Sequence, residues 1–307
     1  MVLVGFLILT LIFMATVRFS VLEIFQPWSI FFHKICLSRL PHESYSHAEL
    51  QALVCGKNFV DASISDIYKS TGLIHLFVVS GAHLLLIEKI LRHFFDPADK
   101  KNIWPLGLCL LIYAFCCNLN PPVTRSLIAM AIGLVTAENH LHWPENFKIL
   151  VCGLLALIFQ PFWITSISLQ LSWLAALVVS VNSLYLSEKN ILLKQSLFFI
   201  VLAPVLTIFQ TPNPLTIFMN LIFAPVLEFI LFPLGLLVWL IPPLYIIFDY
   251  ILFALRTVLQ IFEFQSNQNV QENQTYQIFI GWTLILTLQF YLHFKELDYR
   301  RDHYVYF

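Results

Sequence analysis

The sequence has little charge. Only 11% of its 307 residues are Asp, Glu, Lys or Arg, against roughly 25% in an ordinary soluble domain. The formal net charge is −1, which excludes the global positive field that steers many proteins to nucleic acid. An anion site in this chain would therefore have to be local.

The cysteines lack any CxxC spacing, and most of them fall in apolar segments. This distribution predicts small buried side chains rather than a disulfide framework or a metal site. The six are Cys36, Cys55, Cys109, Cys116, Cys117 and Cys152. We expect neither a metal nor another cofactor.

Apolar residues are what the chain has in abundance, at 59% of the sequence. Runs of roughly twenty apolar residues recur, each long enough to cross a bilayer as a helix. We expect an all-α fold, a polytopic transmembrane helix bundle of about ten segments with broken or re-entrant helices. The expected segments are Val2–Val17, Leu73–Leu91, Ile103–Cys117, Val123–Ala137, Ile149–Trp163, Ile167–Leu186, Leu192–Phe209, Leu215–Ile241, Leu244–Phe262 and Ile278–Leu292.

Four regions follow along the chain. Residues 1–18 are expected to form a membrane anchor helix, because no basic residue precedes the run and no small-residue cleavage site follows it. Residues 19–71 are too polar to span and predict an amphipathic, interfacial segment. Residues 72–263 form the main membrane domain, and residues 264–307 comprise a polar loop, a final membrane helix and a basic tail.

Lys and Arg gather in Lys89–Lys101, near Lys189 and Lys194, and in the C-terminal tail. Even numbers of expected spans separate these places, so all of them can lie in the cytoplasm. This arrangement leaves Arg18–Thr71 outside. The chain is thus expected to be a multi-pass protein of the inner, cytoplasmic membrane.

Prolines punctuate the stretch from Pro204 to Pro243. Each one removes a backbone donor and crowds the preceding turn. Interrupted helices often mark a polar pathway in transporters. Ordinary kinking, with neighbouring helices satisfying the freed carbonyls, is the alternative.

The stretch from Gly72 to Phe95, GLIHLFVVSGAHLLLIEKILRHFF, carries polar groups inside an apolar run. In one unbroken helix, His75 and His83 would lie on nearly the same face, with Ser80 a turn before His83. Gly81 can mark a break or a close helix contact. Because lipid offers these groups no partners, we expect the stretch to face the bundle interior. The plainer alternative is that both histidines are neutral packing residues.

A second polar intrusion is NLNPPVTRSLIAMAIGLV, residues 118–135. Pro121-Pro122 predicts a helix start, which places Arg125 in the first turn. A cation beside the positive end of a helix is unfavourable unless an anion joins it. Arg125 is therefore either a site for phosphate or carboxylate, or a side chain that reaches the lipid headgroups.

The third intrusion places Gln170 and Ser172 inside the apolar helix expected from Ile167 onward. Hydrogen bonding between helices explains both residues without a ligand.

Taken in order, these stretches resemble the membrane competence domain of ComEC-type DNA-uptake proteins. The family pattern G-x-x-H-L-x-x-I-S-G-x-H is matched by GLIHLFVVSGAHL, and V-x-R-A-x-x-M by PPVTRSLIAM. The pattern P-x-x-x-x-x-x-x-F-Q-L-S-F-x-A corresponds to QPFWITSISLQLSWLAAL, and the tract N-P-L-x-N-l-x-x-x-P is echoed by NPLTIFMNLIFAP. The resemblance extends from Ala52 to about Pro243.

The resemblance implies a channel component that passes single-stranded DNA across the inner membrane during natural transformation. It implies a DNA path lined by candidates from the matched motifs: His75, Ser80, Gly81, His83, Arg125, Gln170 and Ser172. The expected partners are single-stranded DNA, the lipid bilayer, a separate nuclease, OB-domain or DNA-delivery protein, and further copies of the chain.

Departures from the family pattern keep other functions open. Ala82 and Ser126 replace the family's usual leucine and alanine. We find no HxHxDH-type motif and no stretch for an OB-fold, so no strand-degrading activity is expected. One alternative is a degenerate, non-conducting paralogue with a structural role. The other is an intramembrane enzyme with Ser80 as nucleophile and a histidine as base. Val78 stands where a GxSG motif needs glycine, so we expect no enzyme.

Overall fold

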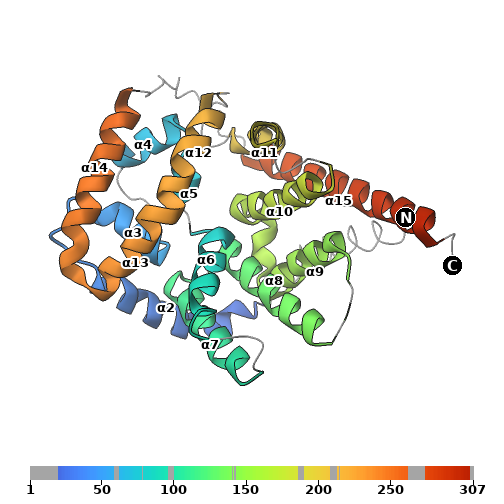
Figure 1. Cartoon of the computed structure of the whole chain (residues 1–307), viewed down its shortest axis with the longest axis horizontal. Helices are drawn as coiled ribbons and strands as arrows, with labels where there is room; N and C mark the ends of the chain where they lie inside the picture. The colour runs from blue at the N-terminus through green and yellow to red at the C-terminus, as the bar shows by residue number, and fades with distance from the viewer. Residues whose placement is uncertain are drawn as a thin grey trace. The chain divides into compact units, whose positions relative to one another are not determined.

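A computed structural model describes residues 20–58, 62–77, 79–95, 100–139, 141, 143–185, 190–207, 213, 215–261 and 274–304 (Figure 1). In these ranges every regular element is a helix and no strand occurs. The all-α prediction is therefore confirmed. The expected anchor helix, residues 1–18, lies outside the described residues.

Long apolar helices make this a membrane protein. Four of the described helices are long and apolar enough to cross a bilayer, namely those at Ile167–Leu184, Leu215–Leu240, Pro242–Ile261 and Thr275–Lys295. Three shorter apolar helices lie at Asn102–Cys116, Pro121–Thr136 and Ile191–Leu206. The count of about ten segments is not confirmed. The expected segment Val2–Val17 lies outside the described residues, and several other runs form helices shorter than a bilayer requires.

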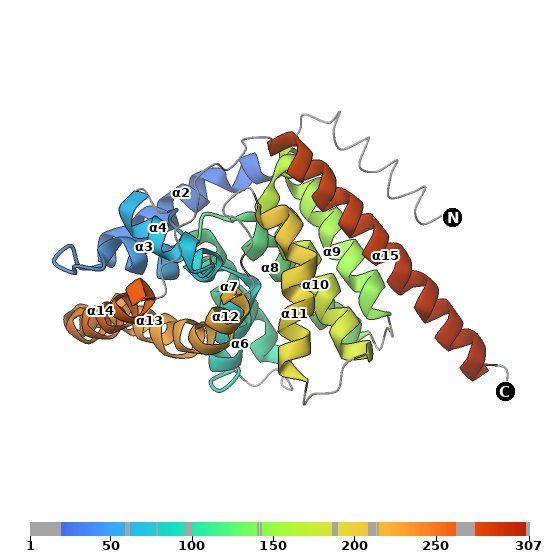
Figure 2. The ribbon, with the colours of Figure 1, turned by 90° about the horizontal axis from the view of Figure 1, so that it is seen from above.

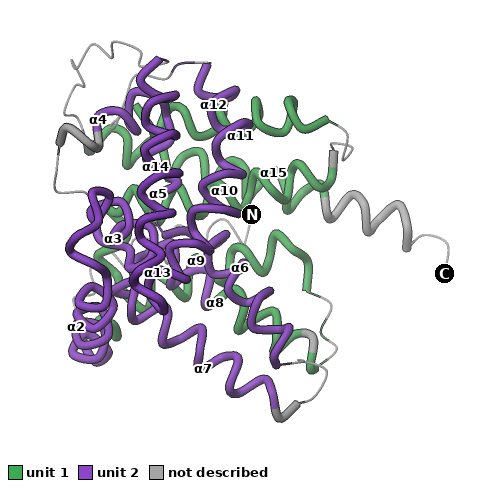
Figure 3. Tube along the Cα trace, turned by 60° about the vertical axis from the view of Figure 1, so that its left-hand side comes forward, with its two compact units in different colours: residues 1–22, 128–208, 271–307 green, residues 23–127, 209–270 purple. Residues whose placement is uncertain are grey.

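The described helices belong to two compact units (Figure 3). Unit 1 comprises residues 1–22, 128–208 and 271–307, and unit 2 comprises residues 23–127 and 209–270. Each unit therefore draws on distant parts of the sequence. The boundary falls inside helix α8, Pro121–Glu138, whose first seven residues belong to unit 2.

Unit 1 contains α9 (Glu145–Phe159), the 3₁₀ turn η1 (Pro161–Thr165), α10 (Ile167–Tyr185), α11 (Ile191–Leu206) and α15 (Gln274–Tyr304). Pro161 ends α9 and begins η1, where its missing N–H costs no hydrogen bond. Figure 2 shows α9, α10 and α15 side by side, as their packing contacts confirm. α15 begins at Gln274 and so includes the last residues of the polar loop expected at Phe264–Gln277.

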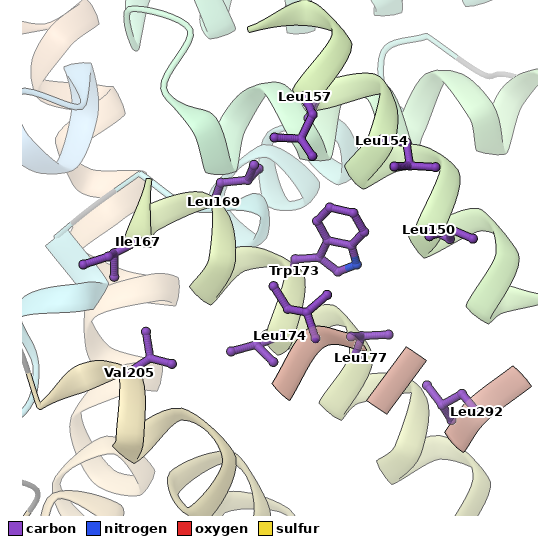
Figure 4. Packing of buried hydrophobic residues seen from close by; sticks show 12 residues of the cluster. Leu150, Leu154, Leu157, Ile167, Leu169, Trp173, Leu174, Leu177, Val205 and Leu292 are labelled. Carbon is purple, nitrogen blue, oxygen red and sulfur yellow. The ribbon is translucent and has the colours of Figure 1, made fainter. Parts of the chain in front are cut away.

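The core of unit 1 is apolar and centres on Trp173 of α10 (Figure 4). This side chain is fully buried among leucines of α9 and α10. Gly153 of α9 lets the indole approach, because a Cβ at this position would overlap the Trp173 ring. A glycine here is thus explained by close helix contact.

Unit 2 contains most of the described helices. They are α2 (Leu22–Arg39), α3 (His47–Cys55), α4 (Ala62–Ser70), α5 (Ile74–Phe77), α6 (Gly81–Leu91), α7 (Lys100–Cys116), the start of α8, α12 (Leu215–Val226), the π-helical turn η2 (Leu227–Leu231), α13 (Phe232–Leu240), the 3₁₀ turn η3 (Pro242–Leu244) and α14 (Tyr245–Ile261). Every residue of α3 from Glu49 to Cys55 is buried. A segment expected at the membrane surface thus contains a helix that is packed within its unit.

The proline-rich stretch, where interrupted or kinked helices were expected, is continuous around Pro225. α12, η2 and α13 follow one another without a gap, but the backbone over Leu227–Leu231 is π-helical. Pro225 and Pro233 cannot donate the usual i→i−4 bonds, and a π-turn absorbs such a disturbance without ending the helix. At Pro242-Pro243 the helix does end, and η3 leads into α14. Pro212 and Pro214 lie outside the described residues.

Two cysteines contradict the expectation of isolated thiols. Cys36 of α2 and Cys55 at the end of α3 form a disulfide, with Cα atoms 5.9 Å apart. The prediction was wrong because it rested on spacing and apolar context, neither of which shows which residues meet in space. The other cysteines, Cys109, Cys116, Cys117 and Cys152, form no disulfide, and all but Cys109 are buried.

Candidate functional site

The SGAH segment breaks a helix. α5 ends at Phe77 and α6 begins at Gly81, with Ser80 extended at φ −111° and ψ 174° as the N-cap residue. The break changes the helical phase between the two histidines. His75 is exposed, whereas His83 is 1% exposed. The two histidines would share a face only in one unbroken helix, and the structure has instead the break that Gly81 was expected to be able to mark.

Ser80 and His83 contact each other at the start of α6 and cap the helix. The Ser80 backbone N–H donates to His83 Nδ1 at 3.0 Å, and Ser80 Oγ lies 3.3 Å from the same nitrogen. His83 thus plays the part that a glutamate plays in a capping box. Because Nδ1 accepts a bond, a neutral ring carries its proton on Nε2.

His83 points into the interior of unit 2. Its ring packs on Phe232 of α13, with ring centroids 4.3 Å apart. The buried Nε2 has no hydrogen-bond partner within the described part of the chain. In this conformation His83 packs and caps, and its ring is closed to solvent.

Gly81 brings two sequence motifs together. A Cβ at Gly81 would overlap Ser126 Oγ, so the first residue of α6 lies directly against α8. Ser126 Oγ donates to the Pro122 carbonyl at 2.9 Å. Arg125, half-buried, precedes Ser126 in α8. The SGAH segment and the first turns of α8 are thus neighbours.

α8 begins at Pro121, as expected from the paired prolines. Arg125 is its fifth residue and so lies just beyond the first turn rather than within it. The preceding turn has positive φ at Asn118 (55°) and Leu119 (47°). Asn118 Oδ1 accepts from Ser29 Oγ of α2 at 3.0 Å.

Two further bonds hold the same turn. His33 Nδ1 bonds the Cys116 carbonyl at 2.7 Å. Asn120 Nδ2 donates to the Gly56 carbonyl, just after α3, at 3.1 Å. α2 and the end of α3 therefore fix the position at which the helix of Arg125 begins.

A charged cluster in unit 2 was missed by the sequence analysis. Glu49 of α3 is fully buried, and its Oε1 forms an ion pair with Arg256 Nη2 of α14. Tyr68 of α4 donates to Glu49 Oε1 at 3.3 Å and accepts from Arg256 Nε at 3.4 Å. Burial raises the pKa of the Tyr68 hydroxyl, which therefore stays protonated.

Asp249 forms a second charged contact from α14. Its Oδ1 accepts from Ser44 Oγ at 2.7 Å and from the Ser46 N–H at 3.2 Å, and its Oδ2 accepts from the Tyr45 N–H at 3.0 Å. A carboxylate is favoured here because α3 starts directly afterwards. The signal was available in the sequence, since Asp249 and Arg256 are ionisable groups seven residues apart in an apolar run.

The remaining candidates belong to unit 1. Gln170 Nε2 donates to the Ile278 carbonyl of α15 at 3.0 Å, and Gly281 leaves room for the amide. Ser172 is half-buried in α10. The hydrogen bond between helices proposed for Gln170 is present. Five of the seven candidates thus lie in unit 2 and two in unit 1.

The described residues contain no group of three His, Cys, Asp or Glu side chains placed to hold a metal ion. Comparison with protein families gives a match to the competence protein family over residues 53–295. The chain belongs to the competence protein family. The matched region includes the SGAH segment, the first turns of α8, Gln170 and α14.

The relatives that match this chain are distant. An uncharacterized protein of Aquifex aeolicus (strain VF5) is 25% identical over 211 residues, 68% of this chain and 46% of the relative. The uncharacterized protein YcaI of Escherichia coli (strain K12) is 29% identical over 133 residues, 39% of this chain and 17% of the relative. The chain thus matches less than half the length of either relative. No solved structure matches it.

Proposed function

We propose that this chain is a membrane channel component that passes single-stranded DNA across the inner membrane during natural transformation. Membership of the competence protein family supports this proposal. The observation that carries it is the contact between Gly81 and Ser126 in unit 2. This contact brings the SGAH segment next to the helix of Arg125. The backbone N–H groups at the start of α6 and the Arg125 guanidinium could then bind phosphate on the same side of a DNA path.

The disulfide supports the orientation inferred from basic residues. Disulfides persist in oxidising compartments and are rare in the cytosol. The Cys36–Cys55 bond lies in Arg18–Thr71, the region assigned to the outside. DNA would then enter from the side of α2 and α3. Nuclease, OB-domain or DNA-delivery proteins on either side are proposed partners, as is a second copy of this chain.

An enzymatic role is not proposed. Ser80 Oγ and His83 Nδ1 are close enough to suggest a nucleophile and its base. The Ser80 amide, however, donates to the same Nδ1 lone pair. His83 Nε2 has no orienting partner among the residues that the structure describes. A cap for α6 accounts for both contacts.

The test is a clean deletion in a naturally transformable host that carries this gene. Transformation frequency and uptake of labelled DNA into the cytoplasm should both collapse, while DNA binding at the cell surface persists. A plasmid copy should restore both. If the deletion strain transforms normally, the chain is the non-conducting paralogue that the departures at Ala82 and Ser126 also allow.

A further inference from the structure

Arg256 lies in an apolar helix that is long enough to cross the membrane. The candidate span is Pro242–Ile261, and Arg256 stands on α14 five residues before its end. A charged side chain within a bilayer is costly and needs a polar partner. Its environment in unit 2 therefore has to explain its presence.

Glu49 supplies part of that explanation. The carboxylate is fully buried and bonds Arg256 Nη2 through Oε1 alone. Its Oε2 is buried without a partner among the described residues. An arginine that serves only to neutralise a carboxylate commonly uses both oxygens in a fork. The contact here is single, which orients the guanidinium without occupying all of it.

The rest of the guanidinium is available. Arginine carries five N–H donors. Nε donates to Tyr68 and Nη2 to Glu49, whereas Nη1 bonds no residue in the described ranges. The Arg256 side chain is 23% exposed. Part of the side chain thus lies at the surface of unit 2, where a donor needs a polar partner that the hydrocarbon of lipid does not offer.

Phosphate oxygens match these donors in geometry and charge. The Glu49 carboxylate offsets the positive charge of Arg256, which weakens the hold on any single phosphate. Weak binding suits a conduit, because an ion that moves through it has to leave each site.

We propose that Arg256, presented by Glu49 and Tyr68, is a phosphodiester contact of the DNA path. This inference rests on the proposed function and adds to the path a residue outside the motifs that predicted it. The same donor chemistry fits the phosphate of a lipid headgroup, so the experiment separates the two sources.

The experiment measures binding of a fluorescent oligothymidylate by the full chain in nanodiscs, as a function of salt. For single strands each phosphate contact contributes about 0.7 to the slope of log K against log[salt]. Arg256→Gln and the double variant Glu49→Gln/Arg256→Gln should lower the slope by about 0.7. Arg256→Lys should keep it, because the charge remains.

Arg92→Gln is the matched control. Arg92 also pairs with a glutamate, Glu88, but its side chain is 43% exposed and lies outside the candidate spans. Its slope should equal that of the wild type. The double variant leaves no unpaired buried charge, so it separates contact from folding. A cooperative thermal unfolding transition verifies that each variant is folded.

Three results would overturn the proposal. If the folded double variant keeps the wild-type slope, Arg256 is a structural partner of Glu49 only, and the proposed function survives. If instead Arg256→Gln loses tightly bound phosphatidylglycerol without a change in slope, the phosphate belongs to lipid. If the wild type binds no oligothymidylate while Arg256 variants behave alike, the proposed function itself fails.

Discussion

The two units differ in the kinds of polar side chain that they bury. The buried polar side chains of unit 1 are neutral, and Gln170 and Gln289 donate to backbone carbonyls on neighbouring helices. Unit 2 buries Glu49 and His83, the two residues with an acidic or basic side chain among the buried polar residues that the structure describes. It also contains the disulfide.

This difference suggests that unit 1 is the structural part of the protein and that unit 2 carries the functional residues. Neutral amides that bond backbone carbonyls hold helices together at modest cost. Buried ionisable groups cost far more and persist where they are paired or functional. We therefore expect unit 1 to tolerate polar changes and unit 2 to lose function or folding through single substitutions.

The largest expected effect concerns Arg125 of unit 2. Arg125→Gln should reduce transformation to nearly the level of the deletion strain, because the charge and the bidentate donors are both lost. Arg125→Lys should reduce it partly, since the charge remains without the planar fork. Immunoblots of membrane fractions provide the control for protein level. Wild-type transformation by a stably expressed Arg125→Gln strain would leave Arg125 as a residue that reaches the headgroups.

Glu49→Gln tests the charged centre of unit 2 directly. Removing one partner leaves the Arg256 charge unpaired and should destabilise the protein by about 3 kcal/mol, the lower end for buried pairs because Arg256 is partly exposed. Thermal unfolding in detergent measures the loss. Asp66→Asn, which breaks the exposed pair with Lys69, is the control and should cost less than about 1 kcal/mol. Equal effects from the two changes would contradict the comparison.

Cys36→Ser/Cys55→Ser should destabilise unit 2 by about 3 kcal/mol, because the bridge closes a loop of 19 residues. Unfolding of the wild type with a strong reductant should match that of the double variant. A wild type that unfolds alike with and without reductant would show that the bridge is absent in the membrane.

Gly153→Ala challenges the apolar core of unit 1. The added methyl group meets the Trp173 ring, which is fully buried and has little room to shift. Overpacking of this kind costs about 1–3 kcal/mol. Trp173→Phe in the same chain should recover part of the loss, since the smaller ring leaves space. Full stability of Gly153→Ala alone would mean that α9 and α10 pack less closely than described.

The smallest effect is expected for Gln170→Leu. The variant loses one hydrogen bond to the Ile278 carbonyl, worth about 1 kcal/mol, and should transform normally. Thermal unfolding and transformation frequency measure the two parts. A stable Gln170→Leu protein that fails to transform would show that Gln170 belongs to the DNA path. It would also contradict the assignment of a purely structural role to unit 1.

Much about this protein was determined by the sequence alone, wherever the cause is local. Apolar runs force helices in a bilayer, because a helix satisfies its own backbone bonds there. Pro121-Pro122 starts α8 because proline is pre-shaped for a first turn. Ser80 and Gly81 stop one helix and start the next for similarly local reasons. The ordered motifs also identified the family.

Contacts between distant residues were decided by the tertiary structure. Glu49 and Arg256 are 207 residues apart, and their spacing carries no sign that they meet. The same is true of the bridge between Cys36 and Cys55, and of the burial of α3. The sequence shows that a charged residue in an apolar run requires a polar partner and that an apolar helix face requires another element to pack against. Which residue meets that need depends on how the helices pack, and so on the whole chain.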